Sequence, residues 1–204
     1  MRSLEEWVFL YRCDGCGSRV RASCDRCLIH LKSLRCGDVN GAIVAMPYSG
    51  IARRLMIGYK YRNHREVGAM FSACLVDRLR ERLQVTQVDV VTWVPTSRLR
   101  RNMRGHDQAE RIARDVARHL GIPVRKLLVK HVNSHQTGKT REQRMIGHWL
   151  EARPMLQPIS VLVIDDVVTT GATLRDARQA LEGAGAKWVL CAAVAATPAP
   201  TRRR

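Results

Sequence analysis

A pair of acids followed by a threonine-rich turn is the part of the sequence best equipped for chemistry. Asp165 and Asp166 end an apolar run, and the stretch VVTTGAT follows them. Such carboxylates can accept hydrogen bonds from vicinal sugar hydroxyls or help to hold a hydrated Mg²⁺. Gly171 permits a tight turn, whose backbone N–H groups at a helix N-terminus can hold a phosphate beside threonine hydroxyls. A site that binds hydroxyl groups or a cation next to a phosphate is typical of a protein that binds a phosphorylated sugar. The alternative is that two acids before an N-capped helix have a structural role alone.

Four cysteines near the N-terminus form a second group suited to ligand binding. They are arranged as two CxxC pairs separated by seven residues, namely Cys13, Cys16, Cys24 and Cys27. Each pair can place two thiolates on one ion, and four thiolates complete a tetrahedral Zn²⁺ site. A closed set of four ligands leaves no open position, so we expect a structural zinc site here. An iron–sulfur centre and a site that has lost its metal are the alternatives.

Several arginines follow the apolar run at residues 88–94, namely Arg98, Arg100, Arg101 and Arg104. Guanidinium groups suit bidentate contact with phosphate, so Arg98, Arg101 and Arg104 are candidate pyrophosphate ligands. Contact with a nucleic-acid backbone and a plain solvated loop are the alternatives. A second polar segment, residues 132–144, contains Gly138 and fits either a mobile lid over the phosphates or an ordinary surface loop.

The composition favours anionic partners. The chain has 204 residues, with 35 Lys and Arg against 18 Asp and Glu, for a net charge of +17. This balance suggests phosphates, pyrophosphate, nucleic acid or an anionic membrane surface as partners, or else a basic solvated surface. No apolar run approaches the roughly 20 residues that span a bilayer, so we expect no membrane insertion. The seven cysteines are an odd number, and the N-terminus lacks the features of a signal peptide, so we expect a reducing, cytoplasmic location.

The elements that must position these groups alternate along the chain. We expect strands at 41–48, 88–94, 124–129, 160–164 and 188–195, and helices at 50–59, 65–83, 107–120, 140–150 and 173–183. This alternation predicts an α/β fold with a doubly wound, mostly parallel sheet. Asp165 and Asp166 then lie at the carboxyl end of a strand, where ligands bind in such sheets. The expected parts are a cysteine module at 1–38, an α/β domain at 39–197 and a basic tail at 198–204.

The stretch VLVIDDVVTTGATL closely resembles the phosphoribosyl-pyrophosphate motif of type I phosphoribosyltransferases. The resemblance implies that Asp165 and Asp166 bind the ribose hydroxyls. It also implies that the 5-phosphate is bound by Thr169, Thr170, Gly171, Ala172 and Thr173. Purine-using members carry an acid–base Asp at the position of Thr169. The threonine therefore disfavours purine salvage and leaves an orotate-type or unusual acceptor, or no catalysis.

The cysteine module ahead of such a domain makes the whole chain similar to the ComF/GntX family, which is linked to DNA uptake and competence. Besides the cysteines and the acidic motif, the matching stretches are Lys60-Tyr61-Arg62, the region from Val94 to Ala109 and, more weakly, Gln136-Thr137-Gly138. Family members commonly have Phe-Asn where this chain has His106-Asp107, which adds a negative charge near the basic loop. The resemblance implies a phosphoribosyltransferase, a glycosyltransferase that uses Mg²⁺ with phosphoribosyl pyrophosphate. A module that binds single-stranded DNA or DNA-processing proteins without catalysis is the alternative.

Overall fold

The computed structural model describes residues 12–20, 23–62, 64–82, 88–97, 105–130 and 150–198. Its main sheet has four strands in the order β1 (Ala42–Pro47), β6 (Trp188–Ala196), β5 (Ser160–Val168) and β2 (Val90–Trp93). All three pairings between these strands are parallel. The prediction of an α/β fold with a mostly parallel sheet is therefore confirmed.

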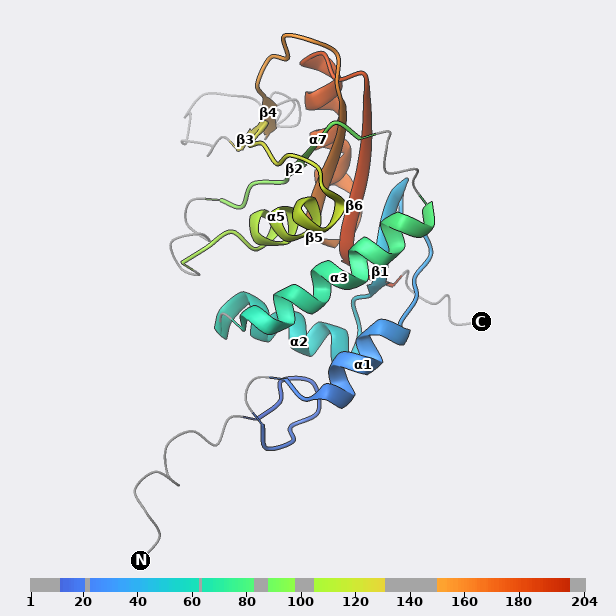
Figure 1. Cartoon of the computed structure of the whole chain (residues 1–204), viewed down its shortest axis with the longest axis vertical. Helices are drawn as coiled ribbons and strands as arrows, with labels where there is room; N and C mark the ends of the chain where they lie inside the picture. Colours follow the sequence, from blue (N-terminus) through green and yellow to red (C-terminus); the bar gives the residue numbers. More distant parts are fainter. Residues whose placement is uncertain are drawn as a thin grey trace, which may run out of the picture.

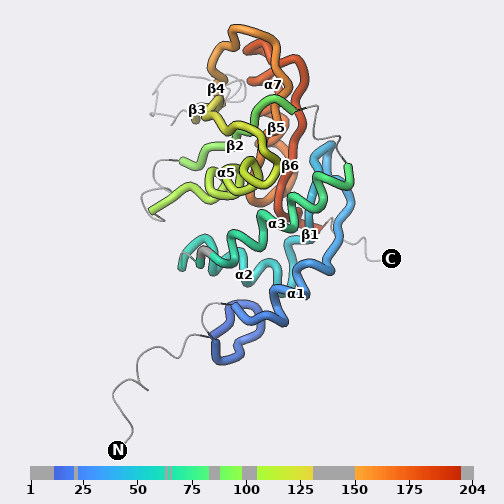
Figure 2. The backbone as a smooth tube through the Cα atoms, in the orientation of Figure 1, coloured from blue at the N-terminus to red at the C-terminus, as the bar shows by residue number. Residues whose placement is uncertain are grey.

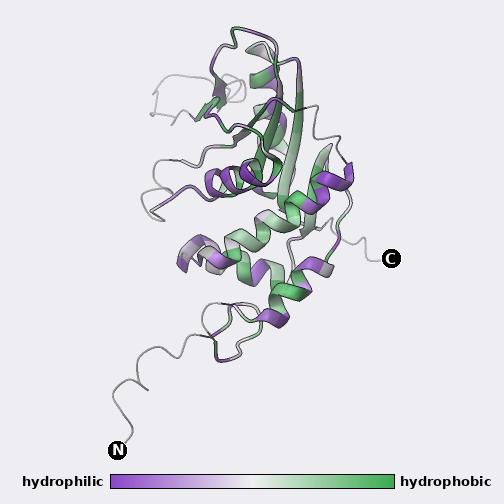
Figure 3. Ribbon diagram, in the orientation of Figure 1, coloured by the Kyte–Doolittle hydropathy of each residue, from purple (hydrophilic) through white to green (hydrophobic). Residues whose placement is uncertain are grey.

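Helices cover both faces of this sheet (Figures 1 and 2). One face packs against α3 (Arg65–Arg82) and α5 (Gln108–Leu120), with α2 (Gly50–Arg62) and α1 (Asp25–Ser33) further along the same side. The other face packs against α7 (Ala172–Gly183). Within β5, Leu162 and Ile164 face the first layer and Val161 and Val163 face α7, because successive side chains of a strand point to opposite faces. The central strand is thus apolar on both faces, and Figure 3 shows it among the hydrophobic parts of the chain.

A second, two-stranded sheet pairs β3 (Leu128–Lys130) with β4 (Leu150–Ala152) in antiparallel fashion beside α7. The strand predicted at 124–129 is therefore displaced, since Val124 makes just an isolated bridge to Val91. The predicted helix at 140–150 and the polar segment 132–144 lie outside the described residues, apart from Leu150, which begins β4. No helix in the described ranges is long and apolar enough to cross a membrane.

Among the elements in the described ranges, the helix α1, which begins within the second cysteine pair, was not predicted from the sequence. Cys27 and Leu31 lie one turn apart on α1 and are both buried in the core cluster that includes α2 and α3. Asp25 in the first turn and Lys32 in the last turn suit the helix dipole. The 27/31 spacing was the available signal, but nine residues offer too little periodicity to stand out.

Candidate functional site

Asp165 and Asp166 lie within the last part of β5, which runs beyond the predicted end at residue 164. Both residues are partly buried, and the backbone N–H of Asp166 donates to Asp165 Oδ1 at 2.8 Å. Asp166 Oδ2 forms an ion pair with Lys60 Nζ, also at 2.8 Å, and the two side chains are 16% and 15% exposed. Lys60 comes from the last turn of α2, so the pair joins two distant segments.

The two acids differ in how well their charges are met. Burial, and then the neighbouring charge of Asp166, raise the pKa of Asp165 to about 7, against the opposing effects of its hydrogen bond and of Lys60. Asp166 has the ion pair with Lys60, whereas within the described residues the carboxylate of Asp165 accepts just the backbone N–H of its neighbour. Asp165 is therefore suited to a hydroxyl donor or a cation from a ligand.

The threonine-rich turn after β5 is held in place by protein contacts. Gly171 has a φ of 73°, a conformation that glycine adopts readily. A Cβ there would lie 3.0 Å from Asn40 Nδ2, so the space also favours glycine. Asn40 Nδ2 and Arg175 Nη1 both donate to the carbonyl oxygen of Thr170, at 2.9 and 3.1 Å. Thr170 Oγ1 in turn accepts from the backbone N–H of Ala172 at 3.4 Å. Hydrogen bonds within the protein therefore fix the turn that opens α7.

A polar cleft of about 330 Å³ lies at the carboxyl ends of β2 and β5. Its lining residues are Tyr48, Lys60, Val94, Pro95, Thr96, Asp107, Gln108, Ala109, Lys130, Asp165, Asp166, Val167, Thr169 and Thr173. The structure thus brings both predicted acids and two of the predicted threonines to one cleft, and Thr170, Gly171 and Ala172 form the adjoining turn. The predicted pyrophosphate ligands Arg98, Arg101 and Arg104 lie outside the described residues.

Asp107 links Thr96, which precedes the basic loop, to the first turn of α5, which follows the loop. Its Oδ2 accepts from the backbone N–H of Thr96 at 2.8 Å, and its Oδ1 accepts from that of Glu110 at 3.3 Å, which caps α5. Burial raises the pKa of Asp107, and these two N–H groups oppose the shift. Both oxygens of the Asp107 carboxylate therefore accept hydrogen bonds that fix the local backbone. The residue does more than add a negative charge near the loop. The Asp-x-x-Glu spacing at a helix start was the sequence signal for this role.

Lys60, Gln108 and Lys130 line the cleft, and the sequence analysis gave none of them a role. Gln108 Nε2 donates to the carbonyl oxygen of Lys60 at 3.2 Å, and the Gln108 carbonyl oxygen accepts from Tyr59 Oη at 3.3 Å. The start of α5 therefore fastens the last turn of α2, which carries Lys60. These contacts join residues about 48 positions apart in the sequence, so no local sequence pattern predicts them.

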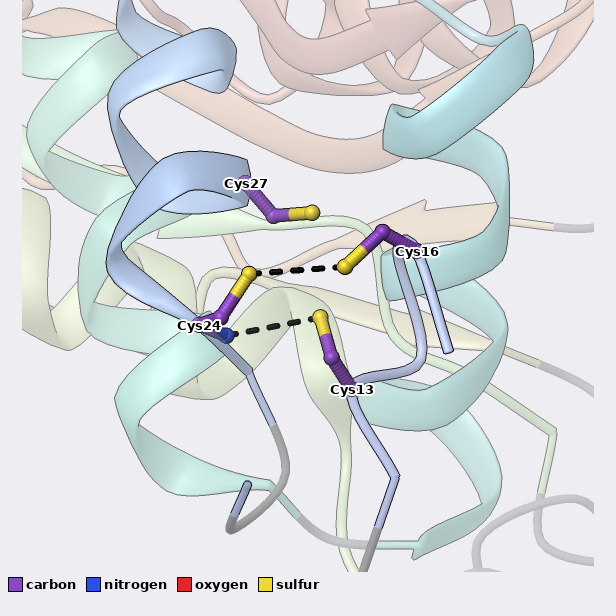
Figure 4. A group of neighbouring side chains, drawn as sticks. All are labelled: Cys13, Cys16, Cys24 and Cys27. Carbon is purple, nitrogen blue, oxygen red and sulfur yellow. Dashed lines mark hydrogen bonds between the residues drawn. The ribbon is translucent and has the colours of Figure 1, made fainter. Parts of the chain in front are cut away.

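The four predicted metal ligands come together in one cluster, with all sulfur atoms within 4.8 Å of one another (Figure 4). Cys16 Sγ lies 3.5 Å from Cys24 Sγ, and the backbone N–H of Cys24 donates to Cys13 Sγ at 3.4 Å. A tetrahedral Zn²⁺ with sulfurs at about 2.3 Å needs sulfur–sulfur separations of about 3.8 Å, so the set fits such an ion. Cys13 and Cys27 are buried, whereas Cys16 is exposed, and hydrogen bonds from Ser18 lower its pKa to about 6.

Comparison with known proteins identifies the class of the second half of the chain. Residues 107–204 match the sequence model of the family described as "Phosphoribosyl transferase domain". A phosphoribosyl transferase domain is therefore present, and it contains the acidic pair and the threonine turn. No curated protein matches the chain.

Solved structures similar to this chain include a glutamine phosphoribosylpyrophosphate amidotransferase from B. subtilis, with 24% identity and a TM-score of 0.48. That match covers 68% of this chain and 30% of the amidotransferase. A purine phosphoribosyltransferase from Pyrococcus horikoshii matches at 20% identity and a TM-score of 0.42, covering 65% of this chain and 74% of the other. An orotate phosphoribosyltransferase from Aeropyrum pernix matches at 18% identity and a TM-score of 0.40, covering 71% and 76%.

Proposed function

We propose that this protein binds phosphoribosyl pyrophosphate with Mg²⁺ in the polar cleft and transfers the phosphoribosyl group to an acceptor. The observation that carries the proposal is the acid pair beside a hydrogen-bonded turn at a helix N-terminus, within a phosphoribosyl transferase domain. In this arrangement Asp165 and Asp166 accept hydrogen bonds from the ribose hydroxyls. The 5-phosphate is held by the turn residues Thr169, Thr170, Gly171, Ala172 and Thr173.

Two further groups serve the pyrophosphate in this proposal. Lys60 and Lys130 line the described part of the cleft, and Arg98, Arg101 and Arg104 follow the strand at its edge. Mg²⁺ supplies charge neutralisation on the diphosphate, and the unmet negative charge of Asp165 is the feature of this chain that favours a cation nearby. Stabilising the charge of the leaving pyrophosphate is the main electrostatic task of the transfer.

The transfer breaks the bond between ribose C1 and the pyrophosphate oxygen, which leaves with the electron pair. A lone pair of the acceptor forms the new bond to C1. Thr169 provides no carboxylate to remove a proton from the acceptor, and Asp107 has both carboxylate oxygens engaged by backbone N–H groups. We therefore propose an orotate-type or other non-purine acceptor, whose proton passes to the leaving pyrophosphate instead of to a carboxylate at residue 169.

Ligand-dependent thermal stability tests the proposal. Millimolar Mg²⁺ and phosphoribosyl pyrophosphate are expected to raise the melting temperature saturably, since a ligand that binds the folded state alone stabilises it. The variant Asp165→Asn/Asp166→Asn should fold and lose this rise, whereas Glu182→Gln, on the exposed side of α7, should keep it. No rise for the unchanged protein at millimolar ligand contradicts the proposal.

We also propose that the cysteine cluster holds structural zinc and that the chain is a ComF-type protein of the cytoplasm, where a reducing environment keeps thiols available. The proposed division remains a cysteine module at 1–38, the transferase domain at 39–197 and a tail at 198–204. A role in DNA uptake, with single-stranded DNA or a DNA-processing protein as partner, is the second candidate function. It is favoured by a groove of about 450 Å³ between the first cysteine pair and α2, where Arg12, Arg54 and Arg62 line the wall.

Salt-dependent binding tests this second function. A phosphate backbone held by arginines should dissociate steeply as salt rises, because counterions are released on binding. The variant Arg12→Ala/Arg54→Ala should bind single-stranded DNA about tenfold more weakly and show a shallower salt slope. Binding that is absent, or that does not change with salt, contradicts a backbone contact in this groove.

A further inference from the structure

We propose that Asp14, inside the first cysteine pair, is a positioning residue for Lys60 and so sets the affinity of the acid pair for the sugar phosphate. This inference rests on the proposed binding of phosphoribosyl pyrophosphate at Asp165 and Asp166. It assigns the cysteine module a part in ligand binding in addition to its own stability.

Asp14 ties the cysteine module to the junction between α2 and α3. Its side chain is 3% exposed, although it lies between two metal-ligand positions in a short turn. The carboxylate forms an ion pair with Arg62, the last residue of α2, and lies 2.9 Å from His64 Nδ1 just beyond it. A buried carboxylate persists when such partners compensate the loss of water.

One face of α2 is shaped to receive this turn. Arg54 Nε donates to the carbonyl oxygen of Gly15 at 2.7 Å. One turn later, a Cβ at Gly58 would overlap the Asp14 carboxylate, and one turn after that stands Arg62. The spacing 54, 58 and 62 places these residues in a single row on the helix. The cysteine module therefore contacts α2 along three turns.

Lys60 stands on the opposite side of the same helix. Each residue of an α-helix is rotated by about 100° from the one before, so Lys60 is turned by about 200° from both Gly58 and Arg62. From that side its Nζ reaches Asp166, while its carbonyl oxygen accepts from Gln108 Nε2. The last turn of α2 is thus held between the Asp14 carboxylate and the acid pair of the cleft.

This geometry makes the orientation of Lys60 depend on the cysteine module. A metal on the four cysteines would hold the turn that presents Asp14, and Asp14 holds the helix end that presents Lys60. Loss of the Asp14 contact frees the last turn of α2 to shift, and Lys60 then meets Asp166 and an incoming diphosphate less well. The consequence falls on ligand affinity at a site in another part of the chain.

A double-mutant cycle on binding tests this coupling. Titration calorimetry with Mg²⁺ and phosphoribosyl pyrophosphate is carried out on the unchanged protein, Asp14→Ala, Lys60→Ala and Asp14→Ala/Lys60→Ala, with zinc content measured in parallel. We expect Asp14→Ala to weaken binding about fivefold and Lys60→Ala about tenfold, and the double variant to match Lys60→Ala within about twofold. Asp25→Ala, an exposed acid of the same module, should bind like the unchanged protein.

The outcomes separate the two proposals. If the unchanged protein binds and Asp14→Ala binds equally well, the positioning role is wrong and the proposed function stands. If the losses of the two single variants multiply in the double variant, Asp14 acts independently of Lys60 and the coupling is wrong. No saturable binding by the unchanged protein overturns both. Should Asp14→Ala lose its metal or fail to fold, Arg62→Ala breaks the same contact from the helix side and leaves the cysteine turn unchanged, and the same non-additivity with Lys60→Ala is required.

Discussion

The cysteine cluster and the acidic cleft are both candidate ligand sites, but they are built in opposite ways. The cluster takes four chemically equal ligands from residues 13–27, and their sulfur atoms already lie within 4.8 Å of one another. The cleft combines unlike groups from distant segments, such as Lys60, Asp107 and Asp165. A closed set of equal ligands suits an ion that stays, whereas an open set with unequal charges suits a ligand that arrives and leaves.

The cysteine cluster and the acidic cleft also differ in how their charges are compensated. In the cluster, all four thiolates would bind directly to one divalent cation in a closed shell. In the cleft, Lys60 pairs with Asp166, and Asp165 keeps a raised pKa beside it. Functional sites commonly retain such unfavourable charges because the ligand relieves them. The comparison therefore predicts that damage to the cluster lowers stability, whereas removing charge from the cleft raises it.

The largest effect is expected from breaking the cluster. Cys13→Ser/Cys16→Ser should abolish zinc binding and lower the free energy of unfolding by about 3 kcal/mol, or about 10 °C in melting temperature. The physical reason is that Cys13, Cys27 and Leu31 belong to the same buried cluster as α2 and α3. Metal analysis and calorimetric melting measure both changes.

Cys36→Ser is the matched control, since Cys36 is a partly buried thiol outside the cluster. It should retain the metal and melt within about 2 °C of the unchanged protein. Equal metal content in the double variant and the unchanged protein contradicts a site made of these four thiolates.

A smaller effect is expected at the turn of the cleft. Gly171→Ala should lower the free energy of unfolding by about 1–2 kcal/mol, because alanine is strained at a φ of 73° and its Cβ would press on Asn40. The displaced turn should also weaken binding of phosphoribosyl pyrophosphate by at least about tenfold. Denaturant unfolding and calorimetric titration measure the two losses.

Gly183→Ala is the control for this change, because a Cβ at Gly183 would meet no atom within 4 Å and its φ is ordinary. It should leave both stability and binding nearly unchanged. If Gly171→Ala binds the ligand normally, the turn is not the phosphate site.

The smallest effect, and the one of opposite sign, is expected for Asp165→Asn without ligand or added Mg²⁺. The pKa of Asp165 is about 7 in the folded protein, above the value of about 3.9 in an unfolded chain. Between these values the folded state holds a proton that the unfolded state releases, so Asp165 destabilises the fold increasingly as pH rises from about 4 to about 7, and the effect is constant above pH 7. The variant should therefore melt higher than the unchanged protein, with the difference widening by about 4 °C between pH 5 and pH 7 and levelling off above pH 7.

Melting curves at several pH values measure this difference, and Glu182→Gln on α7 serves as an exposed control with a constant offset. A difference that stays constant or narrows between pH 5 and pH 7 would show that Asp165 does not carry an unfavourable charge. The proposed electrostatic difference between the cluster and the cleft would then be wrong.

Much of the fold was predictable because its signals are local. Continuous apolar runs predicted β1, β2, β5 and β6 to within a few residues, and helical spacing predicted α2, α3, α5 and α7. The short elements failed for the same reason: α1, β3 and β4 each carry too few residues for a period to show. The strand predicted at 124–129 failed because pairing with Ala152 and Leu150 selects residues 128–130.

The sequence by itself determined which groups are available for binding. The CxxC spacing determined a four-thiolate set, and the order of strand, two acids and glycine turn determined a sugar-phosphate motif, since each lies within one short stretch of chain. Tertiary structure alone decided how those groups are supported. Lys60 meets Asp166, Asn40 meets Thr170, and Asp14 meets Arg62 across separations of 106, 130 and 48 residues, and only packing of the helices on the sheet creates these contacts. Ion pairs and hydrogen bonds act over a few ångströms in space, so their effect on the site depends on the fold and leaves no periodic trace in the sequence.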